Sequence, residues 1–158
     1  MGYLMPLIVL SVFIGLVAVH AHHTQAMTPS VQAEQSELDG RHFLAYRNAV
    51  LSFIQRNPGF TGTVAANALE GQFTAEFLNT VGNYITATSS GKGRIITCYA
   101  TLSPGALYAA RIASDNDASL GMSLGTHWVS IASAVGHSEP LAVSIPHGKV
   151  VSVIQIGV

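Results

Sequence analysis

The longest apolar stretch of the chain lies at its start. Between Leu4 and Val19 there is no charged residue, and Ser11 is the only polar one. A helix rises about 1.5 Å per residue, so a hydrocarbon core about 30 Å thick needs roughly 20 mostly apolar residues. We therefore expect a membrane anchor in residues 1–23, with these residues in the bilayer: Leu4, Leu7, Ile8, Val9, Leu10, Val12, Phe13, Ile14, Leu16 and Val17.

Two kinds of cleaved leader are alternatives to a retained anchor. Val19-His20-Ala21 has the small-x-small form of a signal peptidase site, so cleavage after Ala21 stays open, although no Lys or Arg precedes the apolar stretch. A type IV prepilin leader needs a Glu shortly after the Gly at its cut, and Leu7 stands in that place behind Gly2. The sequence favours the anchor over both leaders.

A polar connector over residues 24–35 is followed by the spacing of an amphipathic helix, which Asn57-Pro58-Gly59 ends. Its apolar residues recur at intervals of three and four and share one face. This face either packs on the domain's own sheet or binds a partner. In the second case the candidate interaction face consists of Phe43, Tyr46, Val50 and Phe53.

The second half of the chain is richer in strand formers. The pattern predicts short helices over 70–79 and over 103–114, the latter with Ser103 as N-cap and Pro104 in its first turn. It predicts a hairpin of 84–88 and 95–99 around a turn at 90–93, and strands over 127–133, 141–145 and 149–157. The last strand has two apolar faces and is expected in the centre of the sheet. Residues 36–158 are thus predicted to form one α+β domain, an antiparallel sheet packed by helices.

Charge is sparse in this chain. Only 9% of its 158 residues are charged, against about 25% in an ordinary soluble domain, and the net charge is −1. No basic patch is available to follow a phosphate backbone, so we expect no nucleic-acid partner. The low charge is consistent with two alternatives: a domain that packs against other subunits, or an exported domain that simply carries few charges.

Several residue clusters resemble chemical sites but lack part of the required pattern. Residues 89–94 contain Gly-Lys-Gly but lack the first glycine and the Ser or Thr of a phosphate-binding loop, so a turn is predicted. Residues 115–117 offer oxygen ligands without the closing Glu of a calcium loop. Cys98 lies in an apolar run and is expected to be buried. The histidines 20, 22, 23 and 42 have no acidic or cysteine neighbours before Glu34, and 127, 137 and 147 fall in separate segments. We expect no metal, no cofactor and no small-molecule substrate.

Gly121-Met122-Ser123-Leu124-Gly125 has the G-x-S-x-G spacing of a nucleophile elbow. That elbow requires a strand before the serine and a helix after it. Here a loop rich in Asp precedes it and an apparent strand follows. An exported serine hydrolase that uses Ser123 is therefore the least favoured function, and a buried Ser123 would exclude it.

Four segments carry a resemblance to a known family: YITATSSGKGRIITCYA, GALYAARIASDNDASLGMS, HWVSIASAVG and IPHGKVVSVIQIG. Together with the apolar N-terminus they resemble the PilM family of type IVB (thin) pilus biogenesis proteins, found with conjugative plasmids. The resemblance implies a small inner-membrane protein of the pilus assembly apparatus, with no catalytic residues. Its expected partners are the membrane and pilins or other apparatus proteins. A minor pilin-like subunit is the alternative.

The orientation of a single-pass anchor depends on flanking charge. No Lys or Arg precedes the span, and Arg41 is the first behind it, so the flanks favour neither side. Because the N-terminal tail is very short, we expect the C-terminal domain in the periplasm.

A retained anchor predicts the mass and the location of the mature protein. After cell fractionation and alkaline carbonate washing, we expect the full-length mass in the inner-membrane pellet. A soluble exported species that lacks roughly the first 21 residues would instead show cleavage by signal peptidase.

Overall fold

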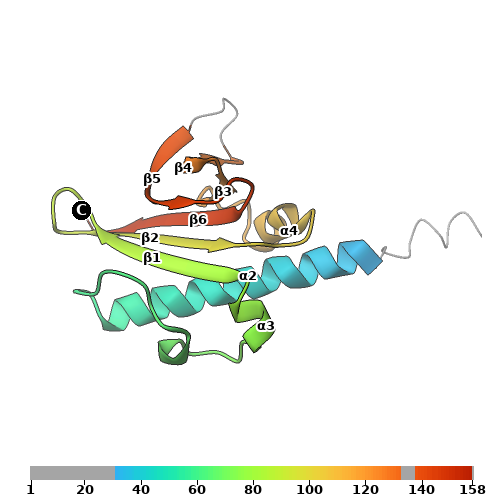
Figure 1. Ribbon diagram of the computed structural model, residues 1–158, viewed down its shortest axis with the longest axis horizontal. Helices are drawn as coiled ribbons and strands as arrows, with labels where there is room; N and C mark the ends of the chain where they lie inside the picture. Colours follow the sequence, from blue (N-terminus) through green and yellow to red (C-terminus); the bar gives the residue numbers. More distant parts are fainter. Residues whose placement is uncertain (1–30, 133–137, 158) are drawn as a thin grey trace, which may run out of the picture. The chain divides into compact units, whose positions relative to one another are not determined.

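The computed structural model describes residues 31–132 and 138–157, which form helices followed mainly by antiparallel strands (Figure 1). The helices are α2 (Val31–Arg56), the 3-10 turn η1 (Ala66–Ala68), α3 (Ala75–Leu78) and α4 (Ala106–Ala113). The strands are β1 (Val81–Ala87), β2 (Arg94–Ala100), β3 (Leu120–Ser123), β4 (Gly125–Ser130), β5 (Ser138–Ile145) and β6 (Val150–Ile156). The predicted α+β class with an antiparallel sheet is confirmed.

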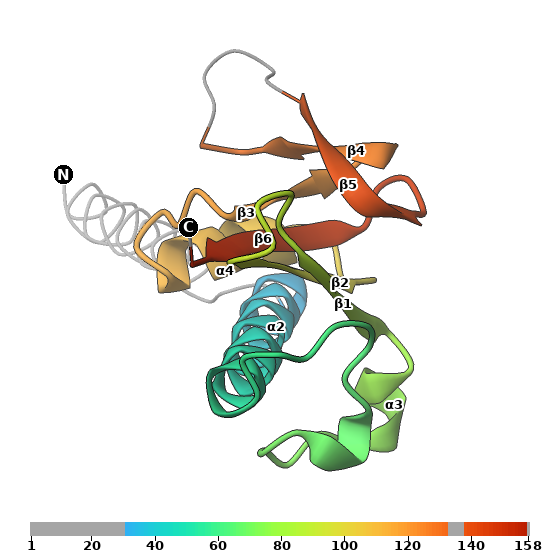
Figure 2. The same cartoon turned by 90° about the vertical axis from the view of Figure 1, so that its left-hand side faces the viewer.

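One sheet contains all six strands, in the order β1-β2-β6-β3-β4-β5 and with antiparallel neighbours. The predicted hairpin is confirmed as β1 and β2, and β6 lies inside the sheet as its two apolar faces indicated. Figures 1 and 2 show α2 on one side of β1 and β2, and β4 and β5 on the other side. The sheet therefore has one half that covers the long helix and one half that turns away from it.

The apolar stripe of α2 lies inside the core. Phe43 and Val50 are completely buried and Tyr46 is 3% exposed. They form a cluster with the inward side chains of the sheet, among them Ile85, Ile96, Cys98, Ala100 and Leu120. Burial of large apolar side chains contributes about 1.5–3 kcal/mol each, so this stripe is a main source of the domain's stability.

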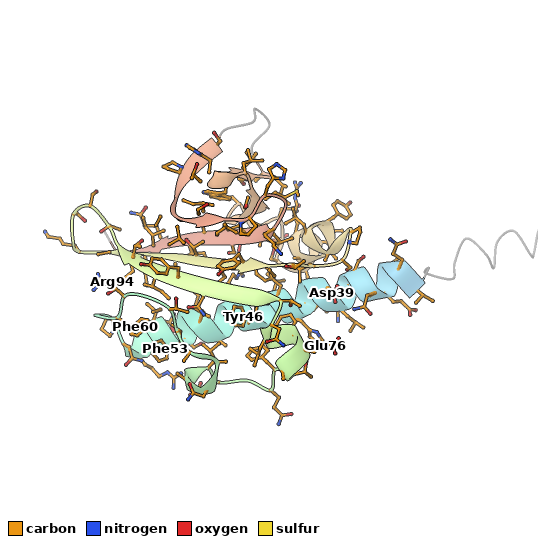
Figure 3. The ribbon with its side chains drawn as sticks, viewed as in Figure 1. Asp39, Tyr46, Phe53, Phe60, Glu76 and Arg94 are labelled. Atoms are coloured by element: carbon orange, nitrogen blue, oxygen red, sulfur yellow. The ribbon has the colours of Figure 1, made fainter. Side chains whose placement is uncertain are left out.

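The segment between α2 and β1 packs on α2 through aromatic rings. Tyr46 makes edge-to-face contacts with Phe73 and Phe77, at ring-centroid distances of 5.8 and 6.2 Å. Phe53 of α2 meets Phe60 in the same geometry at 5.1 Å, and both are labelled in Figure 3. These contacts fix the excursion 57–80 against the helix before the chain enters the sheet.

Asn83 closes the free edge of β1 with side-chain hydrogen bonds. Its amide donates to Tyr46 Oη at 2.7 Å and to the Val64 carbonyl at 3.1 Å, and its Oδ1 accepts from the Val64 amide at 2.7 Å. Next to it, Gly62 exchanges both backbone hydrogen bonds with Ile85. The backbone of residues 62–64 thus occupies this edge in place of a further strand.

Helix α4 crosses α2 at Gly40. A Cβ atom on Gly40 would lie 2.8 Å from the Ala106 carbonyl oxygen and 2.8 Å from the Ala110 nitrogen. Two hydrogen bonds between α2 and the segment before α4 hold this contact: Ser36 Oγ donates to the Pro104 carbonyl, and the Ser103 amide donates to Asp39 Oδ2. Only a residue without a side chain allows this approach.

Three helix boundaries differ from the predictions. Helix α2 begins at Val31, so residues 31–35 of the predicted connector are already helical. Helix α4 begins at Ala106 behind Gly105, whose φ of 89° is left-handed, so Ser103 and Pro104 precede the helix. Helix α3 spans four residues, because the backbone is still extended at its N-cap Thr74, whose hydroxyl accepts from the Phe77 amide. A glycine with positive φ thus precedes α4, whereas an extended threonine precedes α3.

An ion pair joins α2 to the loop before β3. Arg47 is 9% exposed and donates to Asp117 Oδ2 at 2.6 Å. Asp117 Oδ1 accepts from the Ser119 amide at 2.9 Å, and the Ser119 hydroxyl lies 3.1 Å from that of Ser152 on β6. Burial raises the pKa of Asp117, but hydrogen bonds from Ser119 and Arg47 outweigh it, so this pKa lies below its ordinary value of 3.8.

Gly40→Ala tests the helix crossing. The added methyl group meets two backbone atoms that cannot rotate away, so we expect a loss of about 1–2 kcal/mol in the free energy of unfolding, despite the better helix propensity of Ala. The measurement is urea unfolding of the full chain in mild detergent, followed by Trp128 fluorescence. Gly59→Ala is the matched control, because a Cβ there has nothing within 4 Å. Equal stability of the two variants would contradict the assigned role of Gly40.

Asp117→Asn tests the ion pair and its pH dependence. At pH 7 we expect a loss on the order of 2 kcal/mol, between the value of an exposed and of a fully buried pair. Because the folded pKa of Asp117 is lowered, its contribution is present above the unfolded pKa and is lost as pH falls through the folded one. The stability difference between wild type and variant should therefore begin to shrink below about pH 5 and continue to shrink as pH falls through the folded pKa, which lies below 3.8. The control is Asp115→Asn, and a difference that stays constant would refute the assignment.

Candidate partner-binding groove

A groove of about 700 Å³ lies between the loop before β3 and the strands β4, β5 and β6. Its lining mixes carboxylates, hydroxyls and an amide with apolar surface, and consists of Asp117, Ala118, Ser119, Trp128, Ser130, Ala132, Glu139, Val153, Ile154 and Gln155. Grooves of this size accommodate a small molecule or a few residues of a peptide.

The loop wall of the groove is fixed by hydrogen bonds. Asp117 is bound by Arg47 and Ser119, as described above, and the Ser130 hydroxyl donates to the Ala118 carbonyl at 2.7 Å. These polar groups are therefore engaged in holding residues 117–119 in place.

The opposite wall depends on Trp128. A Cβ at Gly121 of β3 would lie 2.8 Å from the Cε3 atom of this indole, so glycine is required for the ring to lie over β3. Trp128 is 5% exposed, and its indole N–H has no acceptor among the described residues. Glu139 of β5 is the cross-strand partner of Trp128, which brings its carboxylate to the same wall.

Strand β5 forms an open edge of the sheet beside the groove. Within the described residues it pairs with β4 alone, and most of its side chains are exposed. Its register with β4 shifts between Gly125 and His127, and Pro140 stands opposite His127. An edge strand presents unpaired backbone donors and acceptors to any segment that can pair with it.

A second exposed feature lies on α4. Tyr108 and Ile112, one turn apart, are 66% and 60% exposed, while Ala106 and Ala110 face the crossing with α2. Two large apolar side chains on one helix face form a second, smaller candidate contact surface.

The candidate interaction face of α2 is corrected by the structure. Phe43, Tyr46 and Val50 lie in the domain's own core, and the half-buried Phe53 packs on Phe60, so the four side chains do not form an exposed docking surface. The same periodicity serves internal packing. Of the two interpretations, the structure supports the one in which the stripe covers the sheet.

Ser123 has no access to a substrate. It lies in β3, is completely buried, and donates its hydroxyl proton to the carbonyls of Ile145 and Pro146 at 2.9 and 2.6 Å. Ser123 is therefore buried in a strand, whereas the serine of a nucleophile elbow is exposed at a turn between a strand and a helix. The finding excludes the serine hydrolase that the G-x-S-x-G spacing suggested.

The other clusters have structural roles. Residues 88–93 form the turn of the β1–β2 hairpin, with Gly91 at a φ of 71°. Asp115 and Asn116 take positive φ in the loop that Asp117 anchors. Cys98 is fully buried, and desolvation raises the pKa of its thiol to about 12, although the charge of Arg47 opposes that shift. Its predicted burial is confirmed.

Metal ligands are scattered in the part of the chain that the structure describes. Residues 31–132 and 138–157 contain no group of three His, Cys, Asp or Glu side chains that could hold a metal ion. His42, His127 and His147 are exposed on different elements. His20, His22, His23 and His137 lie outside the described residues.

The expected membrane anchor, Leu4 to Val17, also lies outside the described residues. Among the helices at 31–132 and 138–157, none combines the length and apolarity that a membrane crossing demands.

Sequence signals for the groove were weak. Its lining comes from four separate segments between Asp117 and Gln155, and no motif joins them. The exposed alternation of β5 and the single tryptophan of the chain were the local signals that could have located it.

The chain is similar to known proteins of one family. No curated protein matches it. The fold is similar to the crystal structure of a protein named PilM from Escherichia coli B7A, with a TM-score of 0.58 and 16% identity, over 81% of this chain and 98% of that one. At this identity the likeness shows a shared fold. The model of the PilM family matches residues 9–153, nearly the whole chain, and the chain therefore belongs to the PilM family of pilus biogenesis proteins.

Proposed function

We propose that this protein is a non-enzymatic component of the type IV pilus assembly machinery, of the kind found with conjugative plasmids. In this proposal residues 4–17 anchor it in the inner membrane as a single span, the domain lies in the periplasm, and the domain binds pilins or other apparatus subunits. Membership of the PilM family and the uncharged N-terminal stretch support the proposal.

The observation that carries the binding role is the open edge of β5 beside the groove. The two ends of the sheet differ: residues 62–64 cover β1, whereas β5 has no second neighbour among the described residues. Adding a strand to such an edge is a common way to bind an extended partner, because backbone hydrogen bonds supply affinity and adjacent pockets supply specificity.

The groove's chemistry supports binding over catalysis. Its hydroxyls and Asp117 are committed to hydrogen bonds within the domain: Arg47 and Ser119 bind the Asp117 carboxylate, Ser119 pairs with Ser152, and Ser130 donates to the Ala118 carbonyl. The alternative of a minor pilin-like subunit requires leader processing, for which Leu7 stands in the place of the needed Glu.

A photo-crosslinking amino acid at Ser144 of β5 tests this function in cells that assemble pili. We expect covalent adducts with a pilin or an apparatus subunit, identified by mass spectrometry. Tyr108 on α4 is the second position, and exposed Gln72 beside α3 is the control. If Ser144 and Tyr108 yield no adduct in piliated cells, or no more than Gln72 does, the proposed binding role is wrong.

A further inference from the structure

We propose that the groove takes an extended segment of a partner protein that carries a lysine or arginine side chain. This inference rests on the proposed function, because it names the chemistry of the partner that the groove accepts. Three features of the groove's lining support it: an unpaired carboxylate, an unused indole donor, and the adjoining backbone edge.

The unpaired carboxylate is that of Glu139. The two acidic lining residues differ, since Asp117 is neutralised by Arg47, whereas Glu139 is exposed and forms no ion pair among the described residues. The lining contains no Lys or Arg in the part of the chain that the structure describes. The nearby Arg111 is held by Asn116 Oδ1 and the Ile131 carbonyl. A cationic side chain of a partner would therefore complement the charge of the Glu139 carboxylate.

The indole donor is Trp128. Its N–H is buried without an acceptor among the described residues, which is unfavourable, so an occupant that brings a carbonyl oxygen within reach of it gains a hydrogen bond. Because Trp128 stands opposite Glu139 on the paired strands β4 and β5, one occupant can contact both residues.

The backbone edge explains why the occupant is extended. A segment paired along β5 projects alternate side chains over the face of the sheet that carries the groove. One of these side chains then reaches the carboxylate of Glu139, which belongs to β5 itself.

The occupant comes from another protein. The chain's own residues before Arg41 contain no Lys or Arg, and neither do residues 133–137. A second copy of the chain offers seven basic residues, of which Arg47 is buried in its ion pair. A peptide selection distinguishes a foreign segment from a second copy, because the selected sequences can be compared with the chain.

The test is selection of short random peptides displayed on phage against the full-length protein in mild detergent at pH 7.5. We expect enriched peptides with β-branched residues around one Lys or Arg. Replacing that residue by Gln, or Glu139 by Gln, should weaken binding about fivefold, the size of a partly shielded ion pair. Trp128 is the only tryptophan, so its fluorescence reports occupancy of the groove directly.

Charge reversal sharpens the test. Selection on Glu139→Lys should enrich Asp or Glu in place of the basic residue, while the control Glu76→Lys, on α3 and labelled in Figure 3, should keep the basic preference. Glu139 is exposed on an edge strand, so both variants are expected to fold.

Enriched peptides without a basic residue, no enrichment, an unchanged preference on Glu139→Lys, or sequences that match the chain itself would each overturn the inference. If crosslinks from Ser144 still capture a pilus subunit, the proposed function survives that failure.

Discussion

The ion pair between Arg47 and Asp117 connects the core of this domain to its surface groove. A charged side chain that is only 11% exposed needs a charged partner and further hydrogen bonds, so the packing of α2 on the sheet depends on the loop before β3, which brings Asp117 to Arg47. The same loop forms one wall of the groove, and Ser119 ties it to Ser152 in the central strand. The position of the groove wall is therefore set by the packing of the core.

The elements with strong local signals were predictable. The β1–β2 hairpin combines alternation with a Gly-containing turn, and β6 has two apolar faces, so pattern alone placed both correctly. The periodicity of α2 also predicted its helix, yet it left open what the apolar face contacts. Only the sheet, formed from residues far along the chain, shows that Phe43 and Val50 pack inside the domain.

The groove could not be derived from the sequence, because its lining residues are far apart in the sequence and come together only in the folded domain. Strand β3 has four residues, one of them Gly121, and is a strand because β4 and β6 supply hydrogen bonds on both sides. Gly121 in turn makes room for Trp128, which gives the groove its wall. Each step depends on a pairing between distant segments, and so the G-x-S-x-G spacing suggested an exposed serine where the sheet buries one.

The two edges of the sheet show how this fold restricts pairing without preventing it. At β1, Gly62 pairs with the backbone of Ile85 and the Asn83 side chain holds Val64 beside it, so residues 62–64 of the same chain cover part of that edge. At β5, the described residues leave the backbone unpaired, but Pro140 removes one donor and Glu139 adds a charge. Both features disfavour indiscriminate strand pairing, since a partner must avoid the missing donor and match the charge. In the proposed function, such an edge suits an assembly component better than a fully closed or a fully open edge. It would accept a partner strand only when the side chains of that strand also fit the groove.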